Sequence, residues 1–281
     1  MIDIAIIGGG PAGLSAAINA AARNKKAVVL SRKKETAALY KAEKINNHLG
    51  LPGQTGAELM DLFLKHAREA GVEIRQGRTF QLMPMGSHFM INFDNDFMEA
   101  KAVILATGIE KGSKIKGEEE YLGKGVSYCA TCDGMLYRGK DVVVIAETEE
   151  GEEDANFLSE ICNKVYYVNT RGTQPALNKN IEILSASVSE VIGGDYVTAV
   201  DAGGQIPVDG AFFIKAAPPL DSLIYGLETR DHGIVVDRAM ATNIPGVFAC
   251  GDVTGKPYQL SKAIGEGQIA GQSTVRYLAA L

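Results

Sequence analysis

The chain has 281 residues, of which 46% are hydrophobic and 22% are charged, and its formal net charge is -6. This length can bury two modest cores, and the acidic balance argues against a nucleic-acid or membrane-surface partner, because both attract an excess of Lys and Arg. Met1 leads directly into an apolar strand, and no apolar run is long enough to span a bilayer, so we expect a cytoplasmic protein.

Strands and helices alternate from the start of the chain. The predicted elements are a strand at 4–7, a glycine loop at 8–13, a helix at 14–22, a strand at 27–30, a helix at 55–70, a hairpin at 89–97 and a buried strand at 102–105. The first four form a βαβ unit, so the fold class is α/β with a parallel sheet and crossover helices.

The same pattern recurs in the second half. Its predicted elements are a strand at 142–145, a helix at 152–162, a strand at 165–168, a further strand at 247–250 and a terminal helix at 260–278. The chain therefore contains two nucleotide-type units. We expect the last strand and helix to complete the first sheet.

The first loop, Gly8-Gly9-Gly10-Pro11-Ala12-Gly13, fits the pattern G-x-G-x-x-G. Gly8 allows a tight turn, Gly10 lets the backbone approach a pyrophosphate, and Gly13 lets the helix pack closely on the strand. N–H groups at the helix start then face the phosphate. A glycine turn without a ligand is the alternative.

Small or polar residues also end two other predicted strands, as Thr107-Gly108 and Gly251-Asp252. The carboxyl ends of strands are where ligands of open α/β sheets bind. With the glycine loop, these residues resemble the FAD-binding half of flavoproteins that contain two dinucleotide domains.

Cys129 and Cys132 form a C-x-x-C pair, which in a reducing compartment is redox-active or metal-binding. Structural zinc needs four ligands, and the sequence has no second C-x-x-C or closely spaced His pair. We therefore favour redox chemistry and expect no metal site. Cys162 and Cys250 lie on apolar elements and are expected to be core thiols.

Residues 125–134, which read Gly-Val-Ser-Tyr-Cys-Ala-Thr-Cys-Asp-Gly, resemble the active-site segment of low-molecular-weight bacterial thioredoxin reductases. Residues 45–50, 244–253 and 259–267 resemble that family's flavin-contacting segment, last FAD motif and terminal helix. The resemblance covers nearly the whole chain, and it implies FAD, thioredoxin as substrate and a homodimer.

The same resemblance implies two Rossmann-like domains, the second inserted in the first. The FAD domain would comprise residues 1–112 and 241–281, and the redox-disulfide domain residues 113–240. The family rotates its inserted domain on two connecting strands, expected here near 112–114 and 238–242.

Residue roles also follow from the resemblance. Cys132 would lie against the flavin, Cys129 would attack the disulfide of thioredoxin, and Asp133 would supply or relay a proton. Ser31 replaces the acid that many dinucleotide folds place after the second strand to hold a ribose. The implied FAD contacts are Gly8, Gly10, Pro11, Ala12, Gly13, Ser31, Arg32, Leu39, Asn47, Thr107, Gly108, Gly251, Asp252, Gln259 and Leu260.

The second nucleotide loop departs from the family. Where the family has a glycine-rich loop for the NADPH pyrophosphate, residues 146–154 read Ala-Glu-Thr-Glu-Glu-Gly-Glu-Glu-Asp, with six carboxylates. Like charges at this helix start oppose binding of a dianion. The family's basic pocket for the 2'-phosphate is reduced to Arg171 within residues 169–172. As an alternative, the acidic residues are a solvated helix start without chemistry of their own.

These departures resemble the ferredoxin-dependent flavin thioredoxin reductases, which lack NADPH motifs. Ferredoxin delivers one electron at a time while a disulfide requires two, so FAD would convert one into the other. Ferredoxins are acidic, and two basic stretches offer a docking face: Arg32, Lys33, Lys34, Lys41 and Lys44, and Lys111, Lys114 and Lys116. Two alternatives stay open: an NADPH-dependent reductase with a divergent loop, and a non-enzymatic flavoprotein redox sensor.

Overall fold

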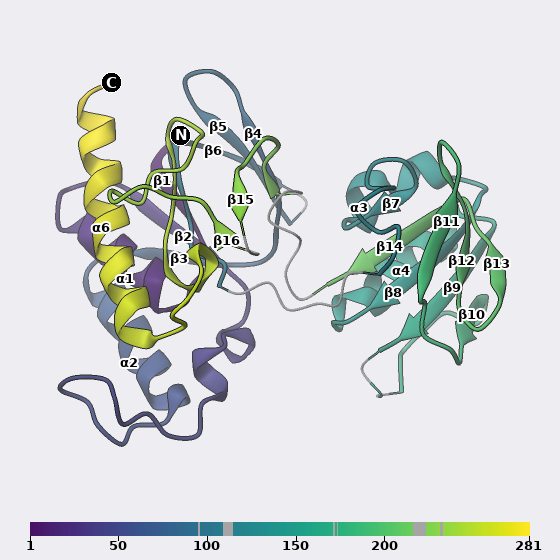
Figure 1. Cartoon of the computed structure of the whole chain (residues 1–281), viewed down its shortest axis with the longest axis horizontal. Helices are drawn as coiled ribbons and strands as arrows, with labels where there is room; N and C mark the ends of the chain where they lie inside the picture. Colours follow the sequence, from purple (N-terminus) through teal and green to yellow (C-terminus); the bar gives the residue numbers. More distant parts are fainter. Residues whose placement is uncertain (95, 109–114, 171, 173, 216–222, 231–232) are drawn as a thin grey trace. The chain divides into compact units, whose positions relative to one another are not determined.

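The computed structural model describes residues 1–94, 96–108, 115–170, 172, 174–215, 223–230 and 233–281 (Figure 1). The chain divides into two compact units, the first comprising Met1–Glu110 and Ala217–Leu281 and the second Lys111–Ala216. Each unit has its own sheet and its own hydrophobic core. Among the described residues, no helix combines the length and hydropathy that crossing a membrane requires.

The first unit is built on a seven-stranded sheet in the order β3-β2-β1-β6-β5-β4, with β17 paired to β6. Strands β3, β2, β1, β6 and β17 are parallel, and β5 and β4 continue the sheet antiparallel. The strands are β1 (Ile2–Ile7), β2 (Ala27–Ser31), β3 (Glu73–Gln76), β4 (Thr79–Pro84), β5 (Phe89–Phe93), β6 (Asp96–Leu105) and β17 (Val247–Ala249).

The central strand β1 is apolar from Ile4 to Ile7 because both of its faces are covered there. Ile4 and Ile6 pack with the alanines of helix α1 (Pro11–Ala21), while Ala5 and Ile7 pack on the opposite core. Helices α2 (Gly56–Glu69) and α6 (Leu260–Ala279) belong to the same unit. A capping box between Thr55 and Glu58 begins α2.

Helices α1 and α6 lie side by side (Figure 1) because α6 carries glycines at the contact. A Cβ added to Gly267 would lie 2.1 Å from the carbonyl oxygen of Ala12, and one added to Gly271 would lie 2.5 Å from that of Ala16. The 3-10 helix η4 (Gly251–Thr254) reaches the same place, since a Cβ on Gly251 would lie 2.7 Å from Cβ of Ala12. The C-terminal segment is thereby held against the start of α1.

The predicted α/β fold class is confirmed, and β17 pairs with β6, as expected of the strand that completes the first sheet. The hairpin differs from expectation. Strand β6 runs from Asp96 to Leu105, so the second arm of the hairpin and the separately predicted buried strand are one element. Its first residues are mostly exposed and its last four are buried. In the sequence, this change of burial within one strand resembles two separate short strands.

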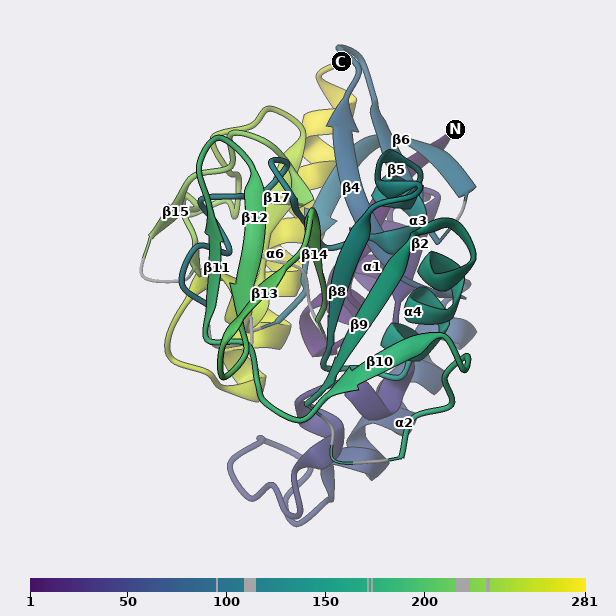
Figure 2. The same cartoon turned by 90° about the vertical axis from the view of Figure 1, so that its right-hand side faces the viewer.

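The second unit has a parallel sheet in the order β10-β9-β8-β14-β7. Its strands are β7 (Val126–Ser127), β8 (Asp141–Ala146), β9 (Lys164–Asn169), β10 (Ile181–Leu184) and β14 (Gly210–Ile214). A three-stranded antiparallel sheet of β11 (Glu190–Gly193), β12 (Val197–Asp201) and β13 (Gln205–Pro207) accompanies it. Helix α4 (Glu150–Ile161) and the short helices α3 (Ala130–Asp133) and η3 (Gly134–Tyr137) complete the unit (Figure 2).

Successive side chains of β8 point to opposite faces of the parallel sheet, and each face packs against a different layer. Val142 and Val144 pack with Leu158 of α4. Val143 packs instead with Val200 of the antiparallel sheet. The parallel sheet is thus sandwiched between α4 and the antiparallel sheet, and β7 forms one of its edges.

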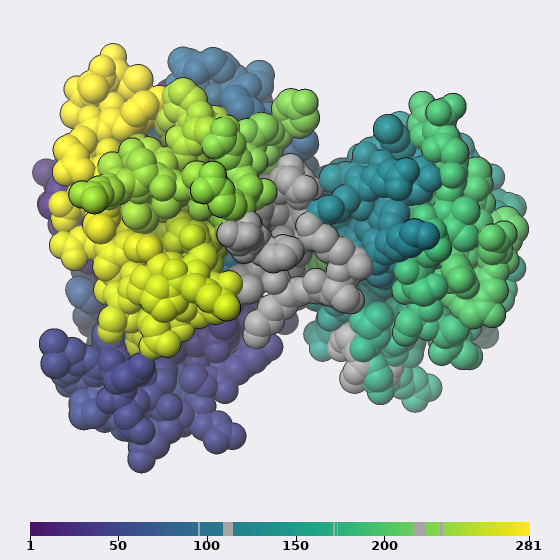
Figure 3. Space-filling model, viewed as in Figure 1, coloured from purple at the N-terminus to yellow at the C-terminus, as the bar shows by residue number. Residues whose placement is uncertain are grey.

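The return to the first unit lies earlier in the chain than the sequence boundary at 240/241. Residues 217–240 group with the first unit, and Leu223, Leu227 and Ile234 share a core cluster with Ile2 of β1. The space-filling view shows the described part of this segment, residues 223–230 and 233–240, in lime beside α6 (Figure 3). It includes the strand pair β15 (Thr229–Arg230) and β16 (Gly233–Ile234).

The connecting strand expected near 238–242 therefore lies inside the first unit, where Ala241 forms a β-bridge with Phe248. The other connecting strand, expected near 112–114, falls outside the described residues. The difference at 217–240 arises because this segment has little regular strand pattern of its own and is placed by the burial of a few apolar side chains.

Candidate functional site

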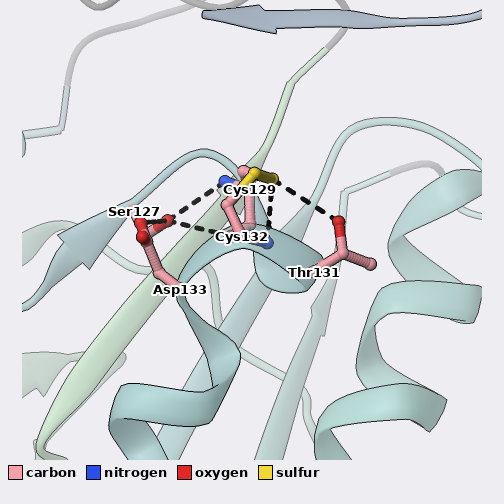
Figure 4. The surroundings of a disulfide bond; sticks show 5 residues. All are labelled: Ser127, Cys129, Thr131, Cys132 and Asp133. Atoms are coloured by element: carbon pink, nitrogen blue, oxygen red, sulfur yellow. Dashed lines mark hydrogen bonds between the residues drawn. A yellow bond between two sulfur atoms is a disulfide. The ribbon is translucent and has the colours of Figure 1, made fainter. Parts of the chain in front are cut away.

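Cys129 and Cys132 form a disulfide directly after the edge strand β7 (Figure 4). Cys129 caps the start of α3 and is buried, whereas Cys132 is exposed. The backbone N–H of Cys132 donates a 3.1 Å hydrogen bond to Sγ of Cys129. Attack on the exposed sulfur of Cys132 would expel Cys129 as a thiolate, and this N–H would stabilise its charge.

Residues 129–133, which contain both cysteines, are called the redox turn below. Ser127, the last residue of β7, makes hydrogen bonds to two residues of this turn (Figure 4). Its hydroxyl donates to Oδ2 of Asp133 at 2.7 Å, and its oxygen accepts from the N–H of Cys129 at 3.1 Å. Ser127 was not among the residues predicted from the sequence. The available signal was a polar residue at the end of an apolar strand, two positions before the cysteine pair.

The glycine loop of the first unit has the geometry that its motif predicts. Gly8 has φ +115°, and a Cβ there would lie 2.2 Å from the carbonyl oxygen of Ala106, so a side chain is excluded. A Cβ on Gly13 would meet the carbonyl oxygen of Gly8 at 2.0 Å. Gly10 caps α1, and a Cβ added to it would have no atom within 4 Å. Pro11 is the first helical residue, and Ala12 after it is buried. The helix start therefore offers open backbone, and its first turn carries no acidic residue.

Two orphaned polar atoms lie beyond neighbouring strands of this sheet. Thr107 follows β6 and Asp252 follows β17, and these strands pair in parallel. Oγ1 of Thr107 and Oδ1 of Asp252 are buried and have no hydrogen-bond partner among the described residues. Burial raises the pKa of Asp252, Lys262 opposes this shift, and Glu266 adds to it. Unsatisfied buried acceptors are costly, so both atoms fit a bound group that supplies hydroxyls, as the ribityl chain of FAD does.

The predicted flavin-contacting residues come together although they are far apart in the sequence. Nδ2 of Asn47 donates to Oε1 of Gln259 at 2.9 Å, and Nδ1 of His48 lies 3.4 Å from Oγ of Ser261. Gln259 caps α6, and Leu260 is the first residue of that helix. The segment around Asn47 thus lies against the start of the terminal helix.

Lys262 and Glu266 brace the turn that carries Asp252, and neither was predicted from the sequence. Nζ of Lys262 donates to the carbonyl oxygens of Gly251 and Gly255 at 2.9 and 2.7 Å. Oε2 of Glu266 accepts from the N–H of Gly251 at 2.9 Å and from Oγ1 of Thr254 at 2.9 Å. Their i,i+4 spacing on α6 was the sequence signal for a pair, but nothing local indicated its target.

The remaining predicted FAD residues have varied surroundings. Ser31 donates to the carbonyl oxygen of Arg32 at 2.9 Å, and a Cβ on Gly9 would lie 2.3 Å from its hydroxyl, so Ser31 adjoins the glycine loop. Arg32 is half-buried after β2. Leu39, in the 3-10 helix η2 (Leu39–Lys41), packs against the hydrophobic core. Gly108 has φ +78° and would accommodate a Cβ only with backbone strain.

The acidic residues occupy the turn between β8 and α4, the counterpart of the glycine loop. Glu150, Glu152 and Glu153 lie in the first turn of α4. Gly151 serves packing, because a Cβ there would lie 2.4 Å from Cβ of Ala146 on β8. This helix start is therefore densely anionic, in contrast to that of α1. Arg171, the remaining basic residue of the next turn, lies outside the described residues.

The two basic stretches are partly neutralised. Lys34 pairs with Asp61, and Lys116 pairs with Glu190. Lys111 and Lys114 fall outside the described residues. In the part of the chain that the structure describes, no group of three or more His, Cys, Asp or Glu residues gathers in a metal-binding arrangement.

The two free cysteines pack in hydrophobic cores, as expected. Burial, with a smaller contribution from Asp141, raises the pKa of the half-buried Cys162 to about 11. Burial also raises the pKa of Cys250, which is fully enclosed after β17.

The chain has extensive likeness to known proteins. The family model described as pyridine nucleotide-disulphide oxidoreductase matches residues 2–267. A thioredoxin reductase of Helicobacter pylori is 34% identical over 308 residues, covering 99% of both chains, and one of Listeria monocytogenes is 31% identical over 298 residues, covering 98% of this chain and 93% of its own. The crystal structure of a ferredoxin-flavin thioredoxin reductase from Clostridium acetobutylicum is 42% identical, covers 100% of this chain and 99% of its own, and gives a TM-score of 0.93.

Proposed function

We propose that this chain, which belongs to the pyridine nucleotide-disulphide oxidoreductase family and within it to the thioredoxin reductases, takes the electrons for thioredoxin reduction from reduced ferredoxin. It is an FAD flavoprotein of that family. The proposal concerns the donor, the residues that transfer the electrons, and the homodimer that the family resemblance implies.

The anionic turn between β8 and α4 is the observation that carries the proposal. A nucleotide pyrophosphate needs open N–H groups at a helix start, and the N-terminus of α1 in the first unit provides them. The equivalent turn in the second unit holds three carboxylates in the first helical turn, and its glycine is committed to packing on β8. Repulsion between these carboxylates and a dianion disfavours NADPH as the donor. The Clostridium acetobutylicum relative, which is named for ferredoxin, supports the alternative donor.

The first unit supplies the residues that would contact FAD. The open backbone at Gly10 and the start of α1 would hold the pyrophosphate. Asp252 and Thr107 would satisfy their buried oxygens on FAD hydroxyls. When bound, FAD supplies the conversion of single electrons into the pair that a disulfide requires.

The second unit supplies the thiol chemistry. Reduction at the exposed sulfur of Cys132 breaks the disulfide and releases Cys129 as a thiolate, which accepts the N–H of Cys132. Asp133, which accepts the Ser127 hydroxyl, would supply or relay the proton that the thiol exchange requires, while Cys129 stays a thiolate for its attack. Cys129 then attacks the disulfide of thioredoxin, and Cys132 resolves the mixed disulfide. Since Cys129 is buried, this attack requires the site to open toward thioredoxin.

The proposal is tested by adding excess NADPH, and separately NADH, to the purified holoprotein without oxygen while the flavin absorbance is followed. Dithionite is the control that the flavin can be reduced, and an NADPH-dependent thioredoxin reductase is the control for the nucleotides. We expect bleaching by dithionite alone. Rapid bleaching by either nucleotide would overturn the donor proposal and favour an NAD(P)H-dependent reductase with a divergent loop.

A second stage separates an enzyme from a redox sensor. Reduced ferredoxin and oxidised thioredoxin are added together, and new thioredoxin thiols are counted by alkylation. We expect thiols to accumulate catalytically with the wild-type protein and not with a Cys129→Ser, Cys132→Ser variant that retains FAD. Flavin reduction without thioredoxin reduction would instead indicate a sensor. Sedimentation of the holoprotein tests the homodimer.

A further inference from the structure

A buried ion pair lies in the second unit, outside the hydrogen bonds of the redox turn. Nζ of Lys215 is 2.6 Å from Oε1 of Glu118, and their side chains are only 3% and 1% exposed. Charged side chains are rarely buried so completely unless they are paired. The thiol chemistry described above uses neither residue.

Glu118 joins three separate segments of the chain. Its Oε1 also accepts a 2.7 Å hydrogen bond from the hydroxyl of Tyr128, and its Oε2 accepts a 3.0 Å bond from the N–H of Ile115. Ile115 is the first described residue of the second unit, and Lys215 is the last, directly after β14. Tyr128 immediately precedes Cys129. One carboxylate therefore connects the entering chain, the leaving chain and the redox segment.

Tyr128 is fixed by packing as well as by its hydroxyl. Its ring lies 6.3 Å from that of Phe213, centroid to centroid, and Nζ of Lys215 lies 5.9 Å from the Tyr128 centroid. Tyr128 belongs to the core cluster that also contains Val143 of β8. Ser127 secures the N–H of Cys129, whereas Tyr128 anchors the preceding peptide to the core.

Stability alone does not account for such a pair, because well-packed apolar residues can often replace a buried ion pair without loss. What apolar residues cannot replace is its directional bonding to Tyr128 and Ile115. We propose that Glu118, Lys215 and Tyr128 form a positioning cluster that holds the Cys129 backbone, keeps the two reduced sulfurs close together and thereby stabilises the disulfide relative to the dithiol.

The physical link is the effective concentration of one thiol at the other. A rigid turn holds the two sulfurs near bonding distance, and this favours disulfide formation. If the anchor of Tyr128 is lost, Cys129 samples more positions, and the equilibrium moves toward the dithiol. The inference rests on the proposed function only in treating Cys129 and Cys132 as its redox pair, and it is independent of the donor.

The test measures the thiol-disulfide equilibrium of the holoprotein in mixtures of oxidised and reduced dithiothreitol. In this exchange, one reduced dithiothreitol becomes oxidised for each Cys129–Cys132 disulfide that becomes a dithiol. Samples are quenched with acid and alkylated, and mass spectrometry measures the fraction of the peptide with Cys129 and Cys132 that is alkylated. The two test proteins are Tyr128→Phe and the double variant Glu118→Leu, Lys215→Met. Far-ultraviolet circular dichroism and thermal unfolding confirm that each variant is folded.

The matched control is the double variant Lys116→Met, Glu190→Gln. It removes an ion pair of 2.7 Å on the same entering segment, but one whose lysine side chain is 76% exposed. We expect the equilibrium constant to shift toward the dithiol by about threefold in Tyr128→Phe and about tenfold in the Glu118, Lys215 variant, and to stay unchanged in the control.

A wild-type constant in folded Tyr128→Phe would overturn the proposal. If the Glu118, Lys215 variant does not fold, Tyr128→Phe decides alone, because it keeps the ion pair and loses only the hydroxyl. An equal shift in the exposed-pair control would also overturn it, since the loss of any ion pair on this segment would then have the same effect. Bleaching of the flavin by NADPH would overturn the donor proposal and leave this measurement unaffected.

Discussion

The hydroxyl of Ser127 donates a 2.7 Å hydrogen bond to Oδ2 of Asp133, across the turn that carries both cysteines. Because Oγ of Ser127 also accepts the N–H of Cys129, this one side chain orients the proposed proton donor and the first cysteine together. A strand end thus provides the rigid support for residues on a short turn.

Ser127→Ala should slow thioredoxin reduction by about 10- to 100-fold, because a misplacement of about 1 Å at a reacting group has effects of that size. The measurement is the rate at which enzyme reduced with one equivalent of dithionite reduces thioredoxin in a stopped-flow instrument. Ser189→Ala is the control, since the Ser189 hydroxyl donates to the carbonyl oxygen of Asp201 in the same unit, away from the two cysteines in the sequence. A wild-type rate in Ser127→Ala would show that Asp133 does not need this support.

The two cysteines should behave differently when each is replaced by serine. Cys132→Ser retains the proposed attacking thiol and lacks the resolving thiol, so it should accumulate a mixed disulfide with thioredoxin. Cys129→Ser should accumulate little. Mass spectrometry without a reductant measures both adducts, and preferential trapping by Cys129→Ser would reverse the assigned roles.

Asp252→Asn should stabilise the apoprotein and weaken FAD binding. Burial raises the pKa of Asp252 above its ordinary value of 3.8, so ionisation is less favourable in the folded state than in the unfolded chain. This favourable contribution of the protonated form is complete below about pH 4 and is lost as the pH rises through the folded-state pKa.

The variant apoprotein should therefore be more stable than wild type by about 1 kcal/mol at pH 7, with the difference fading below pH 4. Urea unfolding at several pH values measures this difference, and FAD titration measures affinity. An apoprotein that is destabilised at pH 7 would contradict the account of Asp252 as an unsatisfied carboxylate.

Two glycines of α6 should respond in opposite directions to alanine. A Cβ on Gly267 would lie 2.1 Å from the carbonyl oxygen of Ala12, while one on Gly265 would meet nothing within 4 Å. Gly267→Ala should lower the free energy of unfolding by about 1 to 3 kcal/mol through overpacking. Gly265→Ala should raise it by up to about 1 kcal/mol through helix propensity. Denaturant unfolding of both apoproteins decides, and equal effects would mean that α1 and α6 are not in close contact there.

Alkylation of Cys162 should depend steeply on pH. Because burial raises its pKa to about 11, the thiol stays protonated at pH 8, and its rate should rise about tenfold per unit between pH 8 and 10 without levelling. In urea the rate should level near the ordinary pKa of 9.0. The background is the Cys129→Ser, Cys132→Ser variant. Levelling near pH 9 in the folded protein would indicate an exposed thiol.

The raised pKa of Cys162 also has a consequence for folding. The folded-state value lies above that of the unfolded chain, so the stability that the protonated thiol contributes is complete below about pH 9 and is lost as the pH rises toward 11. Cys162→Ala should lack that loss.

Features that depend on residues close together in the chain could be predicted from the sequence. The α/β fold class follows from strands and helices that alternate with local periodicity, and the glycine loop follows from positions such as Gly8, where only glycine fits. The C-x-x-C pair and the acidic turn before α4 are also local patterns. Their chemistry could be proposed before any contact was known.

The distant residues that support these features could be identified only from the folded chain. The bond between Asn47 and Gln259, the bracing of Gly251 by Lys262, and the junction of Glu118 with Lys215 each join segments that no short sequence pattern relates. The placement of residues 217–240 in the first unit likewise depends on burial against β1. The hydrophobic effect is non-directional, so an apolar residue in the sequence does not indicate which residue it packs against. The role of a polar side chain becomes evident only when folding brings its partner within hydrogen-bond distance.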